Sequence, residues 1–215
     1  MRTRSSIATI LVVILGCSHT PELEKNDGFS PDQYSPEAIA LNDRAMDLAY
    51  PKELKGFRDT SQFPQAIALL DSALQLNATY SGAYWTKFTL LCQLGRRAEV
   101  ISNFEKWLKY VPGHAGAWQY LGMTYEAGGQ FGLAESCYSK SLNICQKAYD
   151  SHPNYWDLAK AVVDLNALLK RQSVVDSLLV TLKRNFRSEA DDWVNLYFLV
   201  SPENIEERIG HFRCK

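Results

Sequence analysis

Residues 117–142, AWQYLGMTYEAGGQFGLAESCYSKSL, show a helical periodicity on both sides of a Gly-Gly pair. Before the pair, two aromatic residues and a leucine recur at i, i+3 and i+7 with a glycine beside them: Trp118, Leu121, Tyr125 and Gly122. Beyond the pair, small and aromatic residues recur at i, i+4 and i+7: Ala134, Tyr138 and Ser141. These intervals predict two antiparallel helices that approach each other closely where the residues are small.

The order of these residues resembles the tetratricopeptide repeat, a helix–turn–helix unit of 34 residues with the pattern W-x2-L-G-x2-Y, then A-x3-F. A copy one period earlier keeps the register, with Tyr84 in the Trp position and Gly95 at the turn. In that copy Lys87-Phe88 replaces Leu-Gly, and Trp107 replaces a small residue. Its two helices are therefore expected to pack differently.

Two weaker copies flank the two copies described above, which gives four copies in all. The first begins at Ser35-Pro36, an N-cap followed by Pro at the first helical position, and carries a loop insertion near residues 51–64. Its second helix buries Ala66, Leu70 and Ala73. The third copy contains residues 117–142. The Pro expected at its end comes seven residues late, at Pro153, so its second helix should be longer than usual. The fourth copy surrounds a turn at residues 170–172, and only the spacing supports it. The residues expected on the inner faces of its two helices are Val162, Val163 and Asn166 in the first and Val175, Leu179 and Leu182 in the second.

The resemblance implies an all-α fold: a right-handed superhelical stack of antiparallel helix pairs, or α-solenoid. About four repeats would cover residues 35–188, and residues 189–215 would form C-terminal capping helices. The alternative is an ordinary helical bundle, in which the same apolar stripes are core. The repeated interval favours the solenoid.

Residues 1–16 are interpreted as a signal peptide, since Arg2 and Arg4 precede an apolar run that is too short to span a membrane. The run ends in ILGC, residues 14–17, which resembles a bacterial lipobox. That resemblance implies acylation of Cys17, a flexible tether over residues 17–34, and a lipid-anchored protein of the bacterial cell envelope. Ser18 after the cysteine favours the outer membrane.

The charge argues against nucleic acid as a partner, and the cysteine spacing argues against a zinc site. The formal net charge is −1, from 23 basic and 24 acidic residues without a basic run, which argues against nucleic acid. The remaining cysteines form no CxxC pair, so we expect no zinc site. They are interpreted as small buried thiols, with a Cys92–Cys137 disulfide as the alternative: Cys92, Cys137, Cys145 and Cys214.

No local signature of an enzyme is present in the sequence: HExxH, GxSxG and a phosphate-binding loop are all missing. His114 and His152 each neighbour a Pro in an expected loop and are predicted to face solvent. The sequence therefore predicts a protein without catalytic residues, metal or cofactor.

The resemblance instead implies binding, since the first helices of such repeats line a concave groove. Carried onto this chain, the groove positions are Trp85, Thr89, Cys92, Gln119, Met123, Glu126, Lys160 and Asp164. Trp85 is predicted to be an exposed anchor for a partner, and Trp118 to point inward.

The leading hypothesis is a non-enzymatic envelope lipoprotein that holds another protein or peptide in this groove, for example during assembly of a surface or secretion apparatus. An immunity protein that neutralises a delivered toxin is a narrower alternative. An envelope enzyme or a glycan-binding lipoprotein, with a site dispersed in the sequence, is the alternative from a different class.

Overall fold

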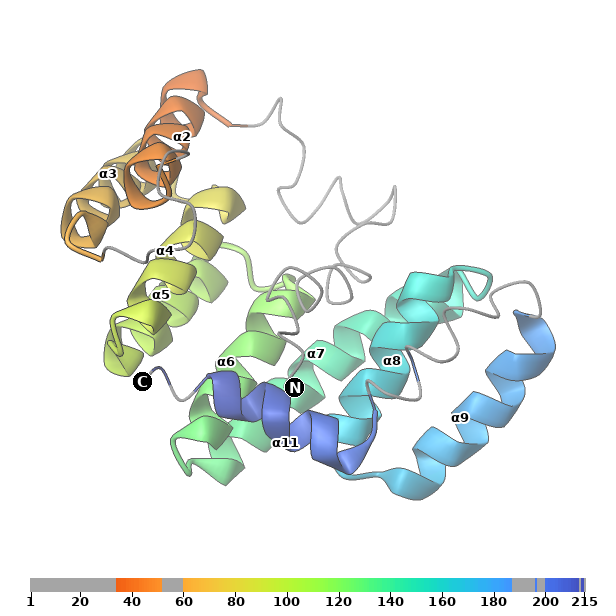
Figure 1. The fold of residues 1–215 in the computed structure, drawn as a ribbon. Coiled ribbons are helices and arrows are strands. Elements are labelled where there is room, and N and C mark those ends of the chain that lie inside the picture. The colour runs from red at the N-terminus through yellow and green to blue at the C-terminus, as the bar shows by residue number, and fades with distance from the viewer. Residues whose placement is uncertain (1–33, 52–59, 187–195, 197–199, 213, 215) are drawn as a thin grey trace. The chain divides into compact units, whose positions relative to one another are not determined.

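The computed structural model describes residues 34–51, 60–186, 196, 200–212 and 214, and every regular element in them is a helix (Figure 1). The prediction of an all-α fold is confirmed. The signal peptide, Cys17 and all of the tether except Tyr34 lie outside the described residues. The helices are α2 Pro36–Ala49, α3 Phe63–Leu76, α4 Ser81–Gln93, α5 Arg97–Tyr110, α6 Ala115–Ala127, α7 Phe131–Ser151, α8 Trp156–Leu168, α9 Gln172–Asn185 and α11 Pro202–His211.

The chain divides into two compact units. The N-terminal unit holds α2 to α5 together with residues 211–215, and the C-terminal unit holds α6 to α9 and the chain up to Gly210. Within the described ranges, no helix is both long and apolar enough to cross a membrane.

In the N-terminal unit each helix packs on the next, and α2 also contacts α4. Helix α2 begins after Ser35 with Pro36 in its first turn, as predicted. The predicted face of α3 is confirmed, since Ala66, Leu70 and Ala73 are fully buried. Tyr34, just before α2, packs on Tyr80 with ring centroids 4.6 Å apart.

In the C-terminal unit α6 packs on α7, α7 on α8, and α8 on α9. Helix α7 has 21 residues and ends just before Pro153, which confirms the prediction that it runs long. The predicted faces of the last pair are buried: Val162, Val163 and Asn166 in α8, and Val175, Leu179 and Leu182 in α9.

Three helix–turn–helix turns share one backbone conformation. A residue with positive φ follows the first helix of each pair: Gly95 at 72°, Gly129 at 77° and Lys170 at 58°. The next residue donates its N–H to a carbonyl five residues earlier, from Arg96 to Leu91, Gln130 to Tyr125, and Arg171 to Asn166. This is the Schellman pattern that ends helices. The same turn therefore recurs in both units.

At Gly122, α6 lies close to α7. A Cβ atom built there would lie 2.5 Å from a ring carbon of Tyr138 and 3.2 Å from the carbonyl oxygen of Ala134. Gly122→Leu is expected to destabilise the protein by about 1 to 3 kcal/mol through overpacking. Gly132→Ala is the control, since nothing lies within 4 Å of its Cβ position. Equal melting temperatures for the two variants would contradict this account.

His114 is buried, with 1% of its surface exposed, so the prediction that it faces solvent is wrong. It caps α6, because its Nδ1 accepts the backbone N–H of Ala117 at 3.1 Å. Burial lowers the pKa of His114 to about 4, outweighing a hydrogen bond within its own residue that raises it. The neutral imidazole is therefore the form that caps the helix.

The low pKa of His114 predicts acid sensitivity. The unfolded chain takes up a proton near pH 6.5 and the folded chain only near pH 4, so His114 favours folding above pH 6.5 and loses this effect as the pH falls. Between pH 7.5 and 5, the wild type should lose about 2 kcal/mol more unfolding free energy than His114→Asn, which keeps a capping side chain. If urea titrations showed equal losses of unfolding free energy in both proteins over this pH range, His114 would not be the source of the acid sensitivity.

Candidate functional site

Asp164 of α8 is the centre of a buried polar cluster in the C-terminal unit. Its Oδ2 accepts a hydrogen bond from Nε2 of Gln119 in α6 at 2.7 Å. Its Oδ1 accepts from Nη1 of Arg208 in α11 at 2.8 Å. Two helices of different pairs thus meet through one carboxylate, and a third helix reaches it with a guanidinium group.

Arg208 and Asp164 form an ion pair whose side chains are 3% and 5% exposed. Burial raises the pKa of the nearby Tyr120 hydroxyl, and Arg208 partly opposes the rise. Taking two charges out of water is costly unless they are paired and hydrogen-bonded. The pair is therefore a strong constraint on where α11 lies in this unit.

Helix α11 contributes little else to the core. Arg208 is its one buried residue, while Ile205 packs partly buried against a cluster from α8 and α9. Ile205, Arg208 and Ile209 stand at i, i+3 and i+4, so they share one face. That spacing was the signal in the sequence that could have pointed to Arg208, which sequence reasoning missed.

The predicted groove residues of the C-terminal unit are therefore less accessible than expected. Gln119 and Asp164 are buried with Arg208, and Met123 is 1% exposed. Lys160 pairs with Asp157 at 2.6 Å instead of reaching Asp164. The structure brings Gln119 and Asp164 together, and it corrects the expectation that these side chains stand open to solvent.

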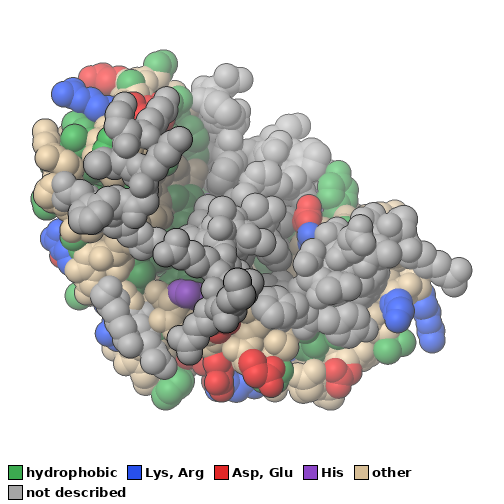
Figure 2. Space-filling view, in the orientation of Figure 1, with side chains coloured by type: hydrophobic (Ala, Val, Ile, Leu, Met, Phe, Trp, Pro, Cys, Tyr) green, Lys and Arg blue, Asp and Glu red, His purple; other side chains and the backbone are tan. Residues whose placement is uncertain are grey.

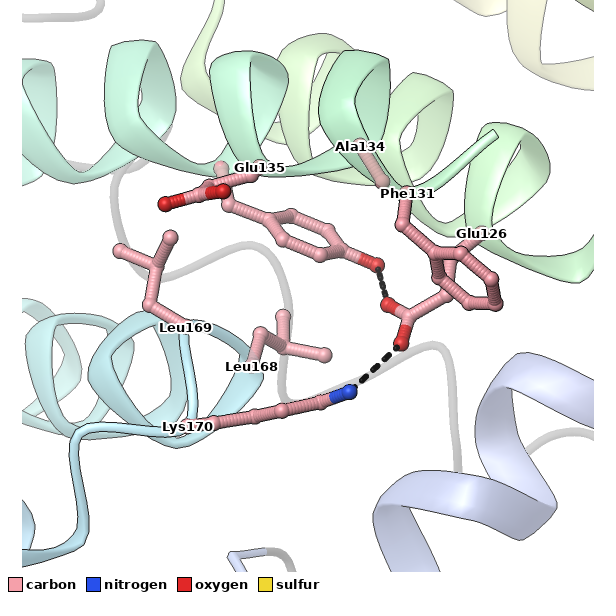
Figure 3. A pocket seen from close by; sticks show the side chains of 8 residues that line it. Glu126, Phe131, Ala134, Glu135, Leu168, Leu169 and Lys170 are labelled. Atoms are coloured by element: carbon pink, nitrogen blue, oxygen red, sulfur yellow. Dashed lines mark hydrogen bonds and ion pairs between the residues drawn. The ribbon is translucent and has the colours of Figure 1, made fainter. Parts of the chain in front are cut away.

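Glu126 lies apart from this cluster, in a pocket of about 190 Å³ beside the two turns of the unit (Figure 3). It accepts a hydrogen bond from the Tyr138 hydroxyl at 2.8 Å and lies 3.8 Å from Nζ of Lys170. Burial, and then the charge of Glu126, raise the pKa of Tyr138, so its hydroxyl stays protonated and donates. Phe131 and Glu135 complete the charged and aromatic lining.

This pocket is small, and its carboxylate is already engaged. Small-molecule sites usually occupy about 300 to 1,000 Å³, more than this cavity offers. The carboxylate of Glu126 is already bound by a tyrosine of α7 and a lysine of the turn after α8. Among the described residues no group of three His, Cys, Asp or Glu side chains could hold a metal ion.

Trp85 of α4 does not stand free on a groove, which corrects the prediction of an exposed anchor. Its ring meets Trp107 edge-on at 5.3 Å and Phe104 at 6.0 Å, both fully buried. Its indole nitrogen is itself buried. Trp118, predicted to point inward, is only half-buried and has Lys140 above its ring at 4.1 Å.

The contrast between these two tryptophans can be measured. Trp85→Ala should cost about 2 to 3 kcal/mol, less than the roughly 3 to 5 kcal/mol of a fully buried ring. Trp118→Ala should cost about 1 kcal/mol, since it loses a partly exposed surface and a cation–π contact. The measurement is a pair of urea titrations; a larger loss at Trp118 would favour the predicted inward orientation of that ring.

Thr89 and Cys92 continue the same helix. The Thr89 hydroxyl donates to the carbonyl of Trp85 at 3.1 Å, and the Cys92 sulfur lies beside Cys214. Both side chains are half-buried. The predicted groove positions of α4 therefore serve intramolecular contacts in the N-terminal unit.

On the face shown in Figure 2, the described basic side chains are scattered among acidic ones and form no single patch. The chain matches no protein-family model, and no curated protein is significantly similar to it in sequence. The tetratricopeptide resemblance therefore rests on the residues and turns described above.

Proposed function

We propose that this protein is a non-enzymatic scaffold of the tetratricopeptide type, in which the helix pairs stack as a right-handed α-solenoid and hold a helical segment of another protein. The recurrence of one turn at Gly95, Gly129 and Lys170 supports the stacking. Gly129 follows Gly95 by 34 residues, the period of that repeat. The hydrogen bond between Gln119 and Asp164 links the first helices of consecutive pairs, which also supports the stacking.

The single observation that carries the binding role is the contact of α11 with Asp164. Helix α11, distant in the sequence, delivers one arginine to a buried carboxylate of α8 that also binds Gln119 of α6. Because Arg208 is the one buried residue of α11, replacing it should release the helix from this site. An outside helix with an arginine and two flanking apolar residues can then replace it.

The sequence also predicts where in the cell the scaffold is located. Acylation at Cys17 would anchor the scaffold to the bacterial envelope, with the outer membrane favoured by Ser18, and residues 18–33 would tether it. Assembly of a surface or secretion apparatus is the process that such an anchored scaffold suits.

A labelled peptide of residues 201–212 tests whether the site accepts a helix from outside. We expect it to bind the full chain carrying Arg208→Ala at least about tenfold more tightly than the wild type, whose own α11 competes. A peptide with Gln in place of Arg208 is the matched control and should bind the variant weakly. Equal binding of both peptides, or none by either, would argue against the proposal.

The natural partner is then sought by crosslinking in intact cells. Wild type and Asp164→Asn are purified from crosslinked membranes and the captured proteins are compared. A partner that the wild type retains and the variant loses, with both chains equally helical, supports the scaffold. Identical captures would show that Asp164 does not bind a partner.

A further inference from the structure

The end of the chain lies along α4 in the N-terminal unit. Phe88 and Cys92 are four residues apart, about one helical turn, and therefore lie on the same face of α4. Phe212 stacks on Phe88 with ring centroids 5.6 Å apart and an interplanar angle of 17°. Phe212 and Cys214 are 7% and 6% exposed, so both side chains are buried in this contact.

The same register brings two thiols together. The sulfur atoms of Cys92 and Cys214 are 2.6 Å apart, although 122 residues separate them in sequence. Non-bonded heavy atoms usually stay about 3.5 to 4.0 Å apart, while the bond of a disulfide is about 2.05 Å long. The pair is therefore closer than two sulfurs that merely pack.

The backbone of Cys214 is held in an uncommon conformation for this contact. Its φ of 48° lies in the left-handed region, which non-glycine residues rarely adopt without a compensating interaction. The Cys92 sulfur also lies 3.7 Å from the carbonyl oxygen of His211, and the Cys214 sulfur 3.2 Å from that of Phe212. The last turn of chain thus directs its thiol at α4.

We propose that Cys92 and Cys214 are a disulfide-forming pair that fastens the C-terminal residues 211–215 covalently to α4. The proposal concerns the chain's own thiols and stands independently of the proposed function. Neither cysteine was expected to pair in this way from sequence, where Cys137 was the alternative partner of Cys92. The interpretation of Cys145 as a free thiol is wrong, since Cys145 is disulfide-bonded.

The environments of the two thiols assign their roles. The hydrogen bond with Cys214 and the positive charge of Arg97 lower the pKa of Cys92, against the effect of burial. The pKa of Cys214 is raised by the same hydrogen bond and by burial. Because the thiolate is the nucleophile in disulfide exchange, Cys92 reacts first.

The oxidant is an external disulfide, either oxidised glutathione or a protein disulfide. The Cys92 thiolate attacks one of its sulfurs, breaks its S–S bond, and releases one thiolate, which takes a proton. The Cys214 sulfur, giving up its own proton, then attacks the Cys92 sulfur and expels the second thiolate. The two cysteines together lose two electrons, and these reduce one external disulfide to two thiols.

The test uses the full chain, reduced and then incubated with oxidised glutathione, alkylated in denaturant and digested with trypsin. We expect alkylation of Cys92 and Cys214 to fall about tenfold relative to the reduced chain. A joined peptide of residues 88–96 and 214–215 should appear, with alkylation of the buried Cys137 unchanged.

Three variants make the result decisive. Cys137→Ser should oxidise as the wild type does. Cys214→Ser should accumulate glutathione on Cys92, because the second step is blocked, whereas Cys92→Ser should leave Cys214 largely unmodified. Circular dichroism confirms that each variant is folded. Full alkylation of both thiols after oxidation of the folded wild type, or a joined peptide linking Cys92 to any other cysteine, would overturn the proposal.

Discussion

Replacing Asp164 with alanine is expected to lower the free energy of unfolding by about 3 to 5 kcal/mol. The variant leaves the Arg208 guanidinium buried without its carboxylate and removes the acceptor of Gln119. Both effects act on side chains that water does not reach, so neither lost contact is replaced by solvent. Unfolding in urea, followed by circular dichroism, measures the change.

Asp157→Ala is the matched control for that substitution. Asp157 also pairs with a basic residue of the same unit, Lys160, but its side chain is 59% exposed. Exposed ion pairs contribute little, so this variant should change stability by less than about 1 kcal/mol. Similar losses at both aspartates would show that burial does not strengthen the Arg208 pair. Amide exchange in α11 of Asp164→Ala shows whether the helix detaches.

Cys17→Ser is expected to move the protein from the membrane to the soluble fraction almost completely. The hydroxyl cannot take the thioether-linked lipid, while the apolar run before it stays intact. Each buried CH₂ of an acyl chain contributes about 0.8 kcal/mol to membrane binding, so loss of all chains removes the anchor. Detergent partitioning of cells grown with labelled fatty acid reports both the label and the location.

Cys137→Ser is the control for that experiment, since Cys137 is buried in α7 and should leave both label and location unchanged. Retention of label by Cys17→Ser would mean that another residue is acylated. Loss of label without release from the membrane would show that a second anchor exists.

Local periodicity predicted the helices well, because which residues share a face depends only on the chain itself. The faces of α3, α8 and α9 follow the predicted intervals. The prediction that Trp85 is exposed was wrong because periodicity does not indicate how bulky the side chains of the opposite helix are. Trp107 stands where the resemblance expects a small residue, and it stacks on Tyr84 at 5.3 Å. The resulting aromatic layer also takes up Trp85.

The contacts that define both sites lie beyond local patterns. Arg208 is 44 residues from Asp164, and Cys214 is 122 residues from Cys92. Nothing in the spacing of either pair indicates a contact, since each depends on how distant helices fold back. The resemblance also implies that the first helices of the pairs are open to a partner. It does not indicate that Arg208 of the chain's own helix α11 binds Asp164.

The turn at Lys170 shows that this turn conformation does not require glycine. Gly95 and Gly129 adopt positive φ without cost, whereas Lys170 reaches φ 58° with a β-carbon and still makes the same hydrogen bonds. The hydrogen bonds of the turn and the packing of α8 on α9 therefore hold this conformation without a glycine. Helix pairs with this turn are therefore found more completely by the backbone conformation of the turn than by a glycine in the sequence.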